Sequence, residues 1–231
     1  MTYFIGVELG QVSDVTAIAV VESLTLPCLR TERVRREGWI DVRPVYQAPD
    51  GSETRDHPTV NFALRHLERF PVGSSYGEIR DRVVVLARGL RGPAVIVDAT
   101  GVGTAAVNLF RYSGVYVTTV TLVAGDQLAQ DGSDYRVPKK DIVSVTQVLL
   151  QTGRLKIARS LPHAQLLARE LVNFRSRVTA QTSESQLDWR EHANDDLVLA
   201  LAIAAWKAEQ NPGLGFSCSV GVSETDGWAG L

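Results

Sequence analysis

Residues 94–123 read AVIVDATGVGTAAVNLFRYSGVYVTTVTLV, and this stretch decides the fold class. Its first apolar run stops at Asp98, a turn-forming segment follows, and residues 104–111 have the spacing of a helix. A second β-branched run begins at Val115 and ends at Val123. The order of strand, helix and strand predicts a β-α-β unit, which is the building block of an α/β domain.

The rest of the chain is predicted to add strands before this unit and helices after it. The other expected elements are strands at residues 3–9, 16–21, 30–39 and 60–70 and helices at residues 76–90, 138–151, 161–174 and 195–209. Residues 30–39 are expected to extend the central sheet, and residues 175–189 have the pattern of an exposed hairpin. We therefore predict one α/β domain, residues 1–210, with a central mixed sheet flanked by helices on both faces. A flexible tail is expected over residues 211–231.

Length and composition favour a single domain without a membrane segment. The chain has 231 residues, of which 45% are apolar, enough for a core shared by two sheet faces. No stretch approaches the roughly 18 apolar residues that span a bilayer, and the start lacks the features of a signal peptide, so a cytosolic location is expected. Cys28 and Cys218 are too few for a disulfide framework or a zinc site, which predicts two free thiols.

Acidic residues stand where predicted core elements end or begin. Glu8 closes the first strand, Asp98 closes a central strand, and Asp195 and Asp196 open the last helix. Open α/β sheets place ligands beyond the carboxyl ends of their strands. Three distant segments would therefore bring carboxylates to one sheet edge, where a divalent cation would offset their repulsion. The pattern predicts a metal-dependent nuclease with these four residues as catalytic metal ligands.

The paired acids and two other polar residues also have structural interpretations. One of Asp195 and Asp196 can cap the buried last helix. We favour Asp196 as the ligand and Asp195 as a cap or auxiliary ligand, although the sequence leaves that choice open. Asp14 is interpreted as a turn former, and His192 as a hydrogen-bonded loop residue.

Positive charge is concentrated in one region although the chain has a net charge of only -2. Residues 136–190 contain ten Lys or Arg and four acidic residues, a net charge of +6. Lys139 and Lys140 begin a predicted helix, where a cation opposes the helix dipole, so phosphate contacts would explain their position. We predict that these lysines, Arg175 and Arg177 contact the DNA backbone. The alternative is that they lie on ordinary solvated helix faces.

Six motifs occur in order between residues 3 and 207: Gly6-Val7-Glu8-Leu9-Gly10, Ser13-Asp14-Val15-Thr16-Ala17, Val97-Asp98-Ala99-Thr100-Gly101-Val102-Gly103, Val137-Pro138-Lys139-Lys140-Asp141, Gly153-Arg154-Leu155 and Asn194-Asp195-Asp196-Leu197-Val198-Leu199-Ala200-Leu201. Together they resemble the nuclease domain of phage terminase large subunits. The resemblance implies an RNase H-like fold, two Mg²⁺ or Mn²⁺ ions and endonucleolytic cutting of double-stranded DNA during genome packaging. It also implies a packaging ATPase, a portal and a small terminase subunit as partners in the host cytoplasm.

The sequence departs from the pattern of this family in three places. Glu8 stands where the family usually has Asp, and its extra methylene would disturb the near-octahedral geometry that magnesium requires. Asn194 stands where the family often has His, and His192 lies two residues earlier. No P-loop motif of the form GxxxxGK[ST] occurs, so the chain is expected to be an isolated domain or a separately encoded nuclease.

Two alternative functions come from different classes of protein. The glycine-rich segments after Gly6 and Asp98 loosely resemble the phosphate loops of actin-like ATPases and sugar kinases, so the chain is alternatively a fragment of such an ATPase. Its length opposes this interpretation because those proteins need two such cores. The other alternative is a catalytically weak DNA-binding or assembly module, in which Glu8 marks lost activity.

Overall fold

The computed structural model describes residues 2–10, 14–24, 28–36, 39–48, 50–55, 60–180 and 195–211. These residues form two units, a larger one that contains the described helices and a smaller one between residues 25 and 60. No helix in the described ranges is long and apolar enough to cross a membrane.

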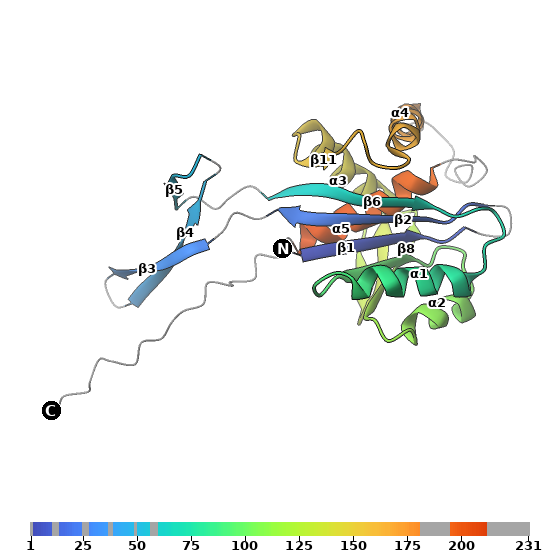
Figure 1. Cartoon of the computed structure of the whole chain (residues 1–231), viewed down its shortest axis with the longest axis horizontal. Helices are drawn as coiled ribbons and strands as arrows, with labels where there is room; N and C mark the ends of the chain where they lie inside the picture. Colours follow the sequence, from blue (N-terminus) through green and yellow to red (C-terminus); the bar gives the residue numbers. More distant parts are fainter. Residues whose placement is uncertain are drawn as a thin grey trace. The chain divides into compact units, whose positions relative to one another are not determined.

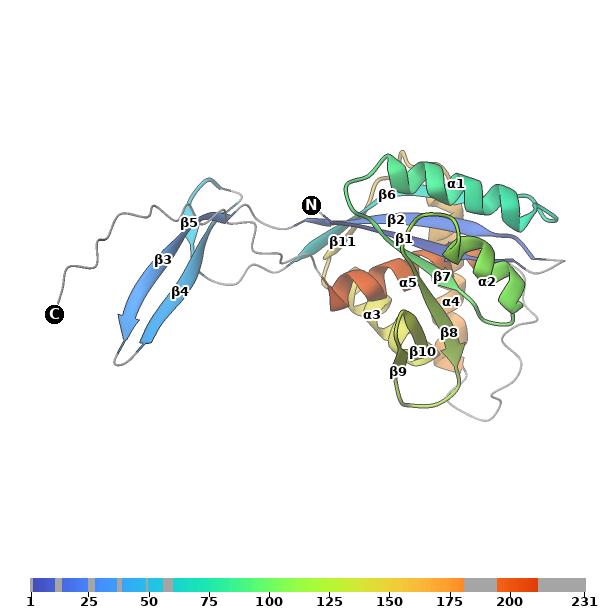
Figure 2. The same cartoon turned by 90° about the horizontal axis from the view of Figure 1, so that it is seen from below.

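Eight strands form the central sheet of the larger unit: β1 (Thr2–Glu8), β2 (Ala17–Leu24), β6 (Asn61–Arg69), β7 (Ala94–Asp98), β8 (Val117–Val123), β9 (Ala129–Asp131), β10 (Asp134–Pro138) and β11 (Leu155–Ile157). Their order across the sheet is β11-β6-β2-β1-β7-β8-β10-β9 (Figures 1 and 2). β2 runs antiparallel to both of its neighbours, whereas β1, β7, β8 and β10 are parallel. The predicted mixed sheet is thus confirmed.

Helices cover both faces of this sheet, as predicted (Figures 1 and 2). The helices α1 (Tyr76–Arg88) and α2 (Thr104–Arg111) lie on one face, and α3 (Lys139–Gln151), α4 (Ala164–Ala180) and α5 (Asp196–Gln210) lie on the other. Along β1, Ile5 and Val7 point towards α1 and α2, where they join a core cluster with Ile79 and Phe110. α5 is buried along most of its length because it packs on the sheet and also contacts α3 and α4.

Local signals in the sequence set several element boundaries. Ser75 and Glu78 form a reciprocal capping box at the start of α1, which satisfies amides of the first helical turn. Gly153 has a φ angle of 65° and follows the end of α3, where a residue with a side chain would be strained. The capping box therefore sets the start of α1, and the glycine sets the end of α3.

Gly6 lets α5 approach the backbone of β1 on the second face of the sheet. A Cβ atom at Gly6 would lie 2.1 Å from the carbonyl oxygen of Ala200 and 3.0 Å from Cβ of Ala204. Only glycine allows so close a contact. Because the first turn of α5 precedes Ala200, this contact places that turn near the carboxyl end of β1.

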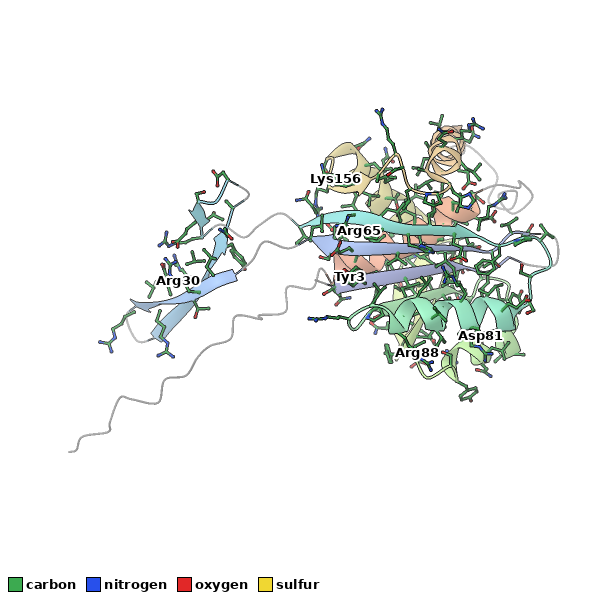
Figure 3. All side chains as sticks on the ribbon, viewed as in Figure 1. Tyr3, Arg30, Arg65, Asp81, Arg88 and Lys156 are labelled. Atoms are coloured by element: carbon green, nitrogen blue, oxygen red, sulfur yellow. The ribbon has the colours of Figure 1, made fainter. Side chains whose placement is uncertain are left out.

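The smaller unit contradicts the expectation that residues 30–39 extend the central sheet. Its strands β3 (Cys28–Arg36), β4 (Trp39–Gln47) and β5 (Glu53–Thr54) form a separate three-stranded antiparallel sheet. Ion pairs join Arg30 to Glu53 and Arg55 to Glu32 across this sheet, and Figure 3 labels Arg30. A strand that carries so many charges cannot be buried on both faces, as a central strand must be, so it pairs elsewhere.

The exposed hairpin predicted over residues 175–189 is wrong for its first part, because α4 continues to Ala180. Apolar residues recur at helical spacing through this region, at Leu167, Leu171, Phe174 and Val178. This helical spacing determines the secondary structure here in spite of the polar residues between them. Residues 181–194 lie outside the described residues. So do Cys218 and the predicted tail beyond Asn211.

Candidate active site

Glu8 and Asp98 lie side by side at the carboxyl ends of adjacent parallel strands. Val7 pairs with Val97 in the register of β1 and β7, so Glu8 and Asp98 occupy the next position on their strands. Side chains alternate along a strand, and Glu8 therefore points to the same face as Gly6, towards α5. The two carboxyl groups are close enough for the charge of Asp98 to raise the pKa of Glu8. Sheet register thus brings together two of the predicted ligands.

The backbone after β7 fixes the Asp98 side chain. Its Oδ1 accepts a hydrogen bond of 2.7 Å from the amide of Thr100, and only 3% of the residue is exposed. The hydroxyl oxygen of Thr100 in turn accepts a bond of 2.8 Å from the amide of Leu122 on β8. Asp98 is therefore held in one orientation by the turn that follows its strand.

The first turn of α5 adds Asp195 and Asp196 to this pair. Burial raises the pKa of Glu8 well above its ordinary value, and the charges of Asp98, Asp196 and Asp195 raise it further. Burial also raises the pKa of Asp196 to about 6, with Asp195 and Asp14 adding to the effect and Arg69 opposing it. All four predicted carboxylates therefore interact electrostatically. The charge of Asp14 also raises the pKa of Asp196, an effect that the turn-forming role expected for Asp14 does not include.

Arg69 is a basic residue of this cluster that the sequence did not single out. Glu8 pairs with Ala17 and Ala17 pairs with Arg69, so the three residues form one row across β1, β2 and β6. One guanidinium nitrogen of Arg69 lies 3.6 Å from Oδ2 of Asp196. Arg69 therefore offsets part of the negative charge.

Glu22 is a buried acid with a structural role, and its partners provide a comparison for Glu8. It accepts a hydrogen bond of 3.1 Å from the Tyr3 hydroxyl and pairs with the Arg65 guanidinium, and Figure 3 labels both partners. Glu8 differs, because its Oε2 is buried and has no hydrogen-bond partner among the described residues. The Glu8 site therefore has acceptor capacity that the described residues do not satisfy.

The donor chemistry of the cluster suits a hard divalent cation. Its candidate ligands are carboxylate oxygens, which Mg²⁺ and Mn²⁺ prefer to sulfur or imidazole donors. Within the described ranges, no three acidic, histidine or cysteine side chains already converge on one ion position. The carboxylates therefore suit a cation by their chemistry, and those other than Asp98 would have to move to share it.

Glu170 is a further buried acid near this cluster that sequence reasoning missed. It lies on α4, with 3% of its surface exposed. Burial raises its pKa to about 7, and the charge of Asp196 adds to this, whereas Arg69 and the amides of Val198 and Leu197 act in the opposite direction. A signal was present in the sequence, since the spacing of Ala164, Leu167 and Glu170 puts an acid on the apolar face of a helix.

The four basic residues predicted to contact DNA belong to α3 and α4, whereas the four predicted carboxylate ligands belong to β1, β7 and the start of α5. Lys139 begins α3 and is half-buried, while Lys140 is exposed and its Nζ pairs with Asp126. Arg175 and Arg177 belong to α4, but their side chains fall outside the described residues, as do His192 and Asn194.

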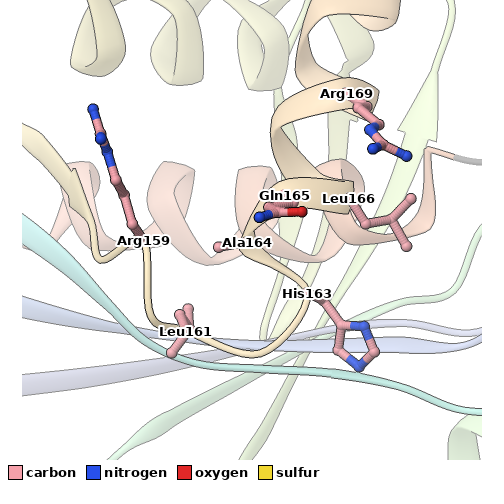
Figure 4. Close-up of a pocket in the computed structure, with 7 residues that line it drawn as sticks. All are labelled: Arg159, Leu161, His163, Ala164, Gln165, Leu166 and Arg169. Carbon is pink, nitrogen blue, oxygen red and sulfur yellow. The ribbon is translucent and has the colours of Figure 1, made fainter.

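A pocket of about 370 Å³ lies at the start of α4 (Figure 4). Its lining residues are Arg159, Leu161, His163, Ala164, Gln165, Leu166 and Arg169. The two arginines belong to the basic region predicted between residues 136 and 190, and their side chains are exposed. None of the four predicted carboxylates lines this pocket, which is therefore not the carboxylate cluster.

No protein-family model matches this sequence, and no curated protein matches it significantly. Solved structures do match. The large terminase nuclease from thermophilic phage G20c with bound cobalt is 18% identical over 88% of this chain and 80% of that chain, with a TM-score of 0.52. The same nuclease with bound magnesium is 17% identical over the same shares, with a TM-score of 0.51. At these identities the likeness shows the fold. The chain therefore has the RNase H-like fold, in the arrangement found in a phage large-terminase nuclease.

Proposed function

We propose that this chain is a divalent-metal-dependent endonuclease that hydrolyses phosphodiester bonds of double-stranded DNA. The observation that carries the proposal is the register of Glu8 and Asp98 on neighbouring strands, with Asp195 and Asp196 added by α5. The buried Glu8 oxygen that has no hydrogen-bond partner among the described residues supports a cation at this point. The fold that the chain shares with a metal-bound terminase nuclease agrees with the same chemistry.

Each residue of the cluster has a role in this proposal. Glu8, Asp98 and Asp196 would hold the cations, with Asp195 as an auxiliary ligand. Two bound ions would supply an activated water and charge stabilisation at the leaving 3′ oxygen. Asp98 needs little reordering because the Thr100 amide already fixes it, and Arg69 neutralises part of the charge of Asp196 in the metal-free protein.

The terminase resemblance extends the proposal to genome packaging. In that setting the chain would act in the host cytoplasm with a packaging ATPase, a portal and a small terminase subunit. Lys139, Lys140, Arg175 and Arg177 would contact the DNA backbone, whose recognition depends on local positive charge. The order of the six motifs and the basic region between residues 136 and 190 support this extension.

The test of the proposal is cleavage of supercoiled plasmid by the purified chain in Mn²⁺ or Mg²⁺, with a chelator as control. We expect nicked and linear products that need the metal. Asp98→Ala should abolish cleavage and leave the protein folded, because it removes one charge from a repulsive cluster. Asp196→Asn should behave similarly and Asp195→Asn should lose less. Cleavage by Asp98→Ala at the parent rate would refute the assignment.

A catalytically weak DNA-binding or assembly module is the second candidate. Two observations favour it: Glu8 replaces the usual Asp, and no described group of side chains is already arranged to hold an ion. Calorimetric titration separates the candidates. The nuclease binds Mn²⁺, the inert module binds neither Mn²⁺ nor ATP, and binding of ATP would instead indicate the actin-like class.

A further inference from the structure

The pocket at the start of α4 has a basic and partly apolar lining, and no described acid lines it. Arg159 and Arg169 contribute guanidinium groups, and His163 contributes an imidazole. Leu161 and Leu166 add apolar surface. Figure 4 shows that Arg159 belongs to the loop before the helix, whereas Arg169 belongs to the helix itself. The volume of about 370 Å³ suits a small ligand group, and the lining favours one with negative charge.

The two arginines of the pocket are open to such a ligand. Both side chains are exposed, and neither has an ion-pair or hydrogen-bond partner in the part of the chain that the structure describes. Arg154, by contrast, donates bonds of 2.8 Å to both carboxylate oxygens of Glu209. A guanidinium group can donate two parallel hydrogen bonds to a phosphate, which matches its planar shape. The pocket therefore offers phosphate-binding groups that no internal acid occupies.

Two backbone amides add further donors to this lining. The amide of Leu167 donates a bond of 2.9 Å to the carbonyl oxygen of His163, so the amides of Gln165 and Leu166 precede the hydrogen-bonded ladder of α4. Neither of these two amides has an acceptor among the described residues. Proteins commonly combine arginine side chains with backbone amides where they contact DNA phosphates. The amides thus supplement a site that the arginines define.

We propose that this pocket binds one sugar-phosphate unit of the DNA backbone. The inference rests on the proposed function, because it takes DNA as the substrate. Arg159 and Arg169 would hold the same phosphate from two sides, and Leu161 and Leu166 would contact the apolar face of the adjoining sugar. Contacts of this kind fix the position of a duplex without selecting its sequence. The site is distinct from the four basic residues that the sequence predicts as DNA contacts.

The pocket and the carboxylate cluster belong to the same face of the central sheet. α4 and α5 both cover this face and contact each other, and α5 begins with Asp196 (Figure 2). A duplex whose scissile phosphate lies at the cluster would therefore pass α4, and the pocket would hold a second phosphate of the same molecule. Arg159 and Arg169 are then positioning residues, because they contact the substrate away from the reacting atoms.

The first test is the affinity for a DNA duplex in the presence of a chelator, measured by fluorescence anisotropy at several salt concentrations. Arg159→Ala combined with Arg169→Ala should weaken binding about 10-fold, through the loss of charge-assisted hydrogen bonds. The slope of log affinity against log salt should fall by about one, because the two arginines share one phosphate. An unchanged slope, or a fall of about two as for two separate phosphates, would overturn the inference.

The matched control for this test is Arg88→Ala combined with Arg91→Ala. It also removes two exposed arginines, one at the end of α1 and one just beyond it. Its affinity and salt slope should stay near those of the parent. If the control lost as much affinity as the pocket variant, the effect would come from net charge alone, and the pocket would have no role.

The second test blocks the pocket while both arginines stay in place. Gln165 is exposed, lines the pocket and lies in the first turn of α4. Gln165→Glu adds a carboxylate there, and the melting temperature should not fall because an acid suits the first turn of a helix. DNA affinity should fall about as much as in the double arginine variant, whereas Gln165→Ala should bind like the parent. Equal DNA affinities of Gln165→Glu and Gln165→Ala would contradict the site.

Calorimetry with inorganic phosphate and with a deoxynucleoside monophosphate identifies the source of the phosphate group. Both should bind the parent more weakly than the duplex does, because each offers only part of the DNA contact. Tight binding of either compound, together with unchanged DNA affinity in the double arginine variant, would assign the pocket to a free phosphate compound and refute DNA as its ligand.

The chelator separates this inference from the proposed nuclease activity. A parent protein that binds DNA through the pocket but leaves plasmid intact in Mn²⁺ would refute the nuclease and support the phosphate site. A parent that cuts plasmid, with a double arginine variant of unchanged affinity and salt slope, would support the nuclease and refute the site. In an active parent, the double arginine variant should raise KM and leave kcat near its original value, because neither arginine belongs to the carboxylate cluster.

Discussion

Glu8 and Asp98 end two neighbouring parallel strands at the same level of the sheet, and the charge of Asp98 raises the pKa of Glu8. The separation of these residues is set by the pairing of β1 with β7, and flanking core residues such as Val7 and Val97 are fully buried. Substitutions at either acid should therefore change the chemistry of the cluster while the surrounding sheet stays in place.

The identity of the carboxylate at position 8 should determine which metal supports activity. The longer side chain of Glu8 must fold back or displace the ion, and magnesium tolerates irregular coordination poorly. We expect weak activity in the parent, clearer in Mn²⁺ than in Mg²⁺, a faster Mg²⁺-supported rate in Glu8→Asp, and no activity in Glu8→Ala. Plasmid cleavage by the three proteins, measured in parallel, checks this. Parent-like cutting by Glu8→Ala would exclude a ligand role, and a slower Mg²⁺ rate in Glu8→Asp would show a site adapted to glutamate.

Gly6→Ala should damage the cluster from a distance. The added Cβ would overlap the carbonyl oxygen of Ala200, so α5 must move away from β1 and carry Asp196 with it. We expect a loss of stability of about 1–3 kcal/mol, as for other overpacked core positions, together with weaker binding of Mn²⁺. Thermal unfolding and calorimetry measure the two effects. The control is Gly77→Ala on α1, where the new Cβ would meet only the Ser75 hydroxyl at 3.8 Å. If Gly6→Ala and Gly77→Ala had the same stability and the same affinity for Mn²⁺, α5 would tolerate the displacement.

The metal-free protein should lose stability from the carboxylate cluster as the pH rises. The pKa of Asp196 is about 6 in the folded state against an ordinary value of 3.8, so the folded state binds the proton more tightly than the unfolded state does. This contribution is complete below pH 3.8 and is lost as the pH passes about 6. Asp196→Asn should therefore melt at a higher temperature than the parent at pH 7 and lose that advantage near pH 4. Surface acids such as Asp134, whose pKa is lowered by Thr119 and Arg111, make the protein more stable as the pH rises. Their contribution is the same in the parent and in Asp196→Asn, so it cancels in the difference between the two melting temperatures. A difference in melting temperature that does not vary with pH would contradict the assigned shift.

Lys139→Ala combined with Lys140→Ala should weaken DNA binding by similar factors for unrelated sequences. If both side chains contact phosphates, the slope of log affinity against log salt should fall by about two, roughly one for each contact. Fluorescence anisotropy at several salt concentrations measures this. Arg88→Ala is the matched control, because Arg88 is exposed on α1, on the other face of the sheet (Figure 3). Unchanged affinity at every salt concentration would assign the lysines to an ordinary solvated surface, where Lys140 pairs with Asp126.

Elements with strong local signals could be predicted from the sequence. The helix expected at residues 104–111 is found with those bounds as α2, since Gly103 precedes its apolar face and a turn with Gly114 follows it. The acids were also predictable as a group, because Glu8 and Asp98 directly follow buried β-branched runs. In both cases the deciding information lies within a few neighbouring residues.

Features that depend on distant contacts could not be predicted in this way. The short strands β9, β10 and β11 have only three to five residues each, too few for a periodic pattern, and they exist through pairing with their neighbours. Arg69 joins the cluster because the register of β2 and β6 aligns it with Glu8. The position of Glu170 depends on the packing of α4 against α5, which no local pattern encodes.

The close contact between α5 and Gly6 also has a consequence during synthesis of the chain. Glu8 and Asp98 are made early, but the acids that complete the cluster arrive with the last described helix. Contacts between segments so far apart in sequence form late in folding, because the intervening loop must first be closed. A nascent or prematurely terminated chain without α5 therefore lacks half of the carboxylates, and it should not damage the DNA around it.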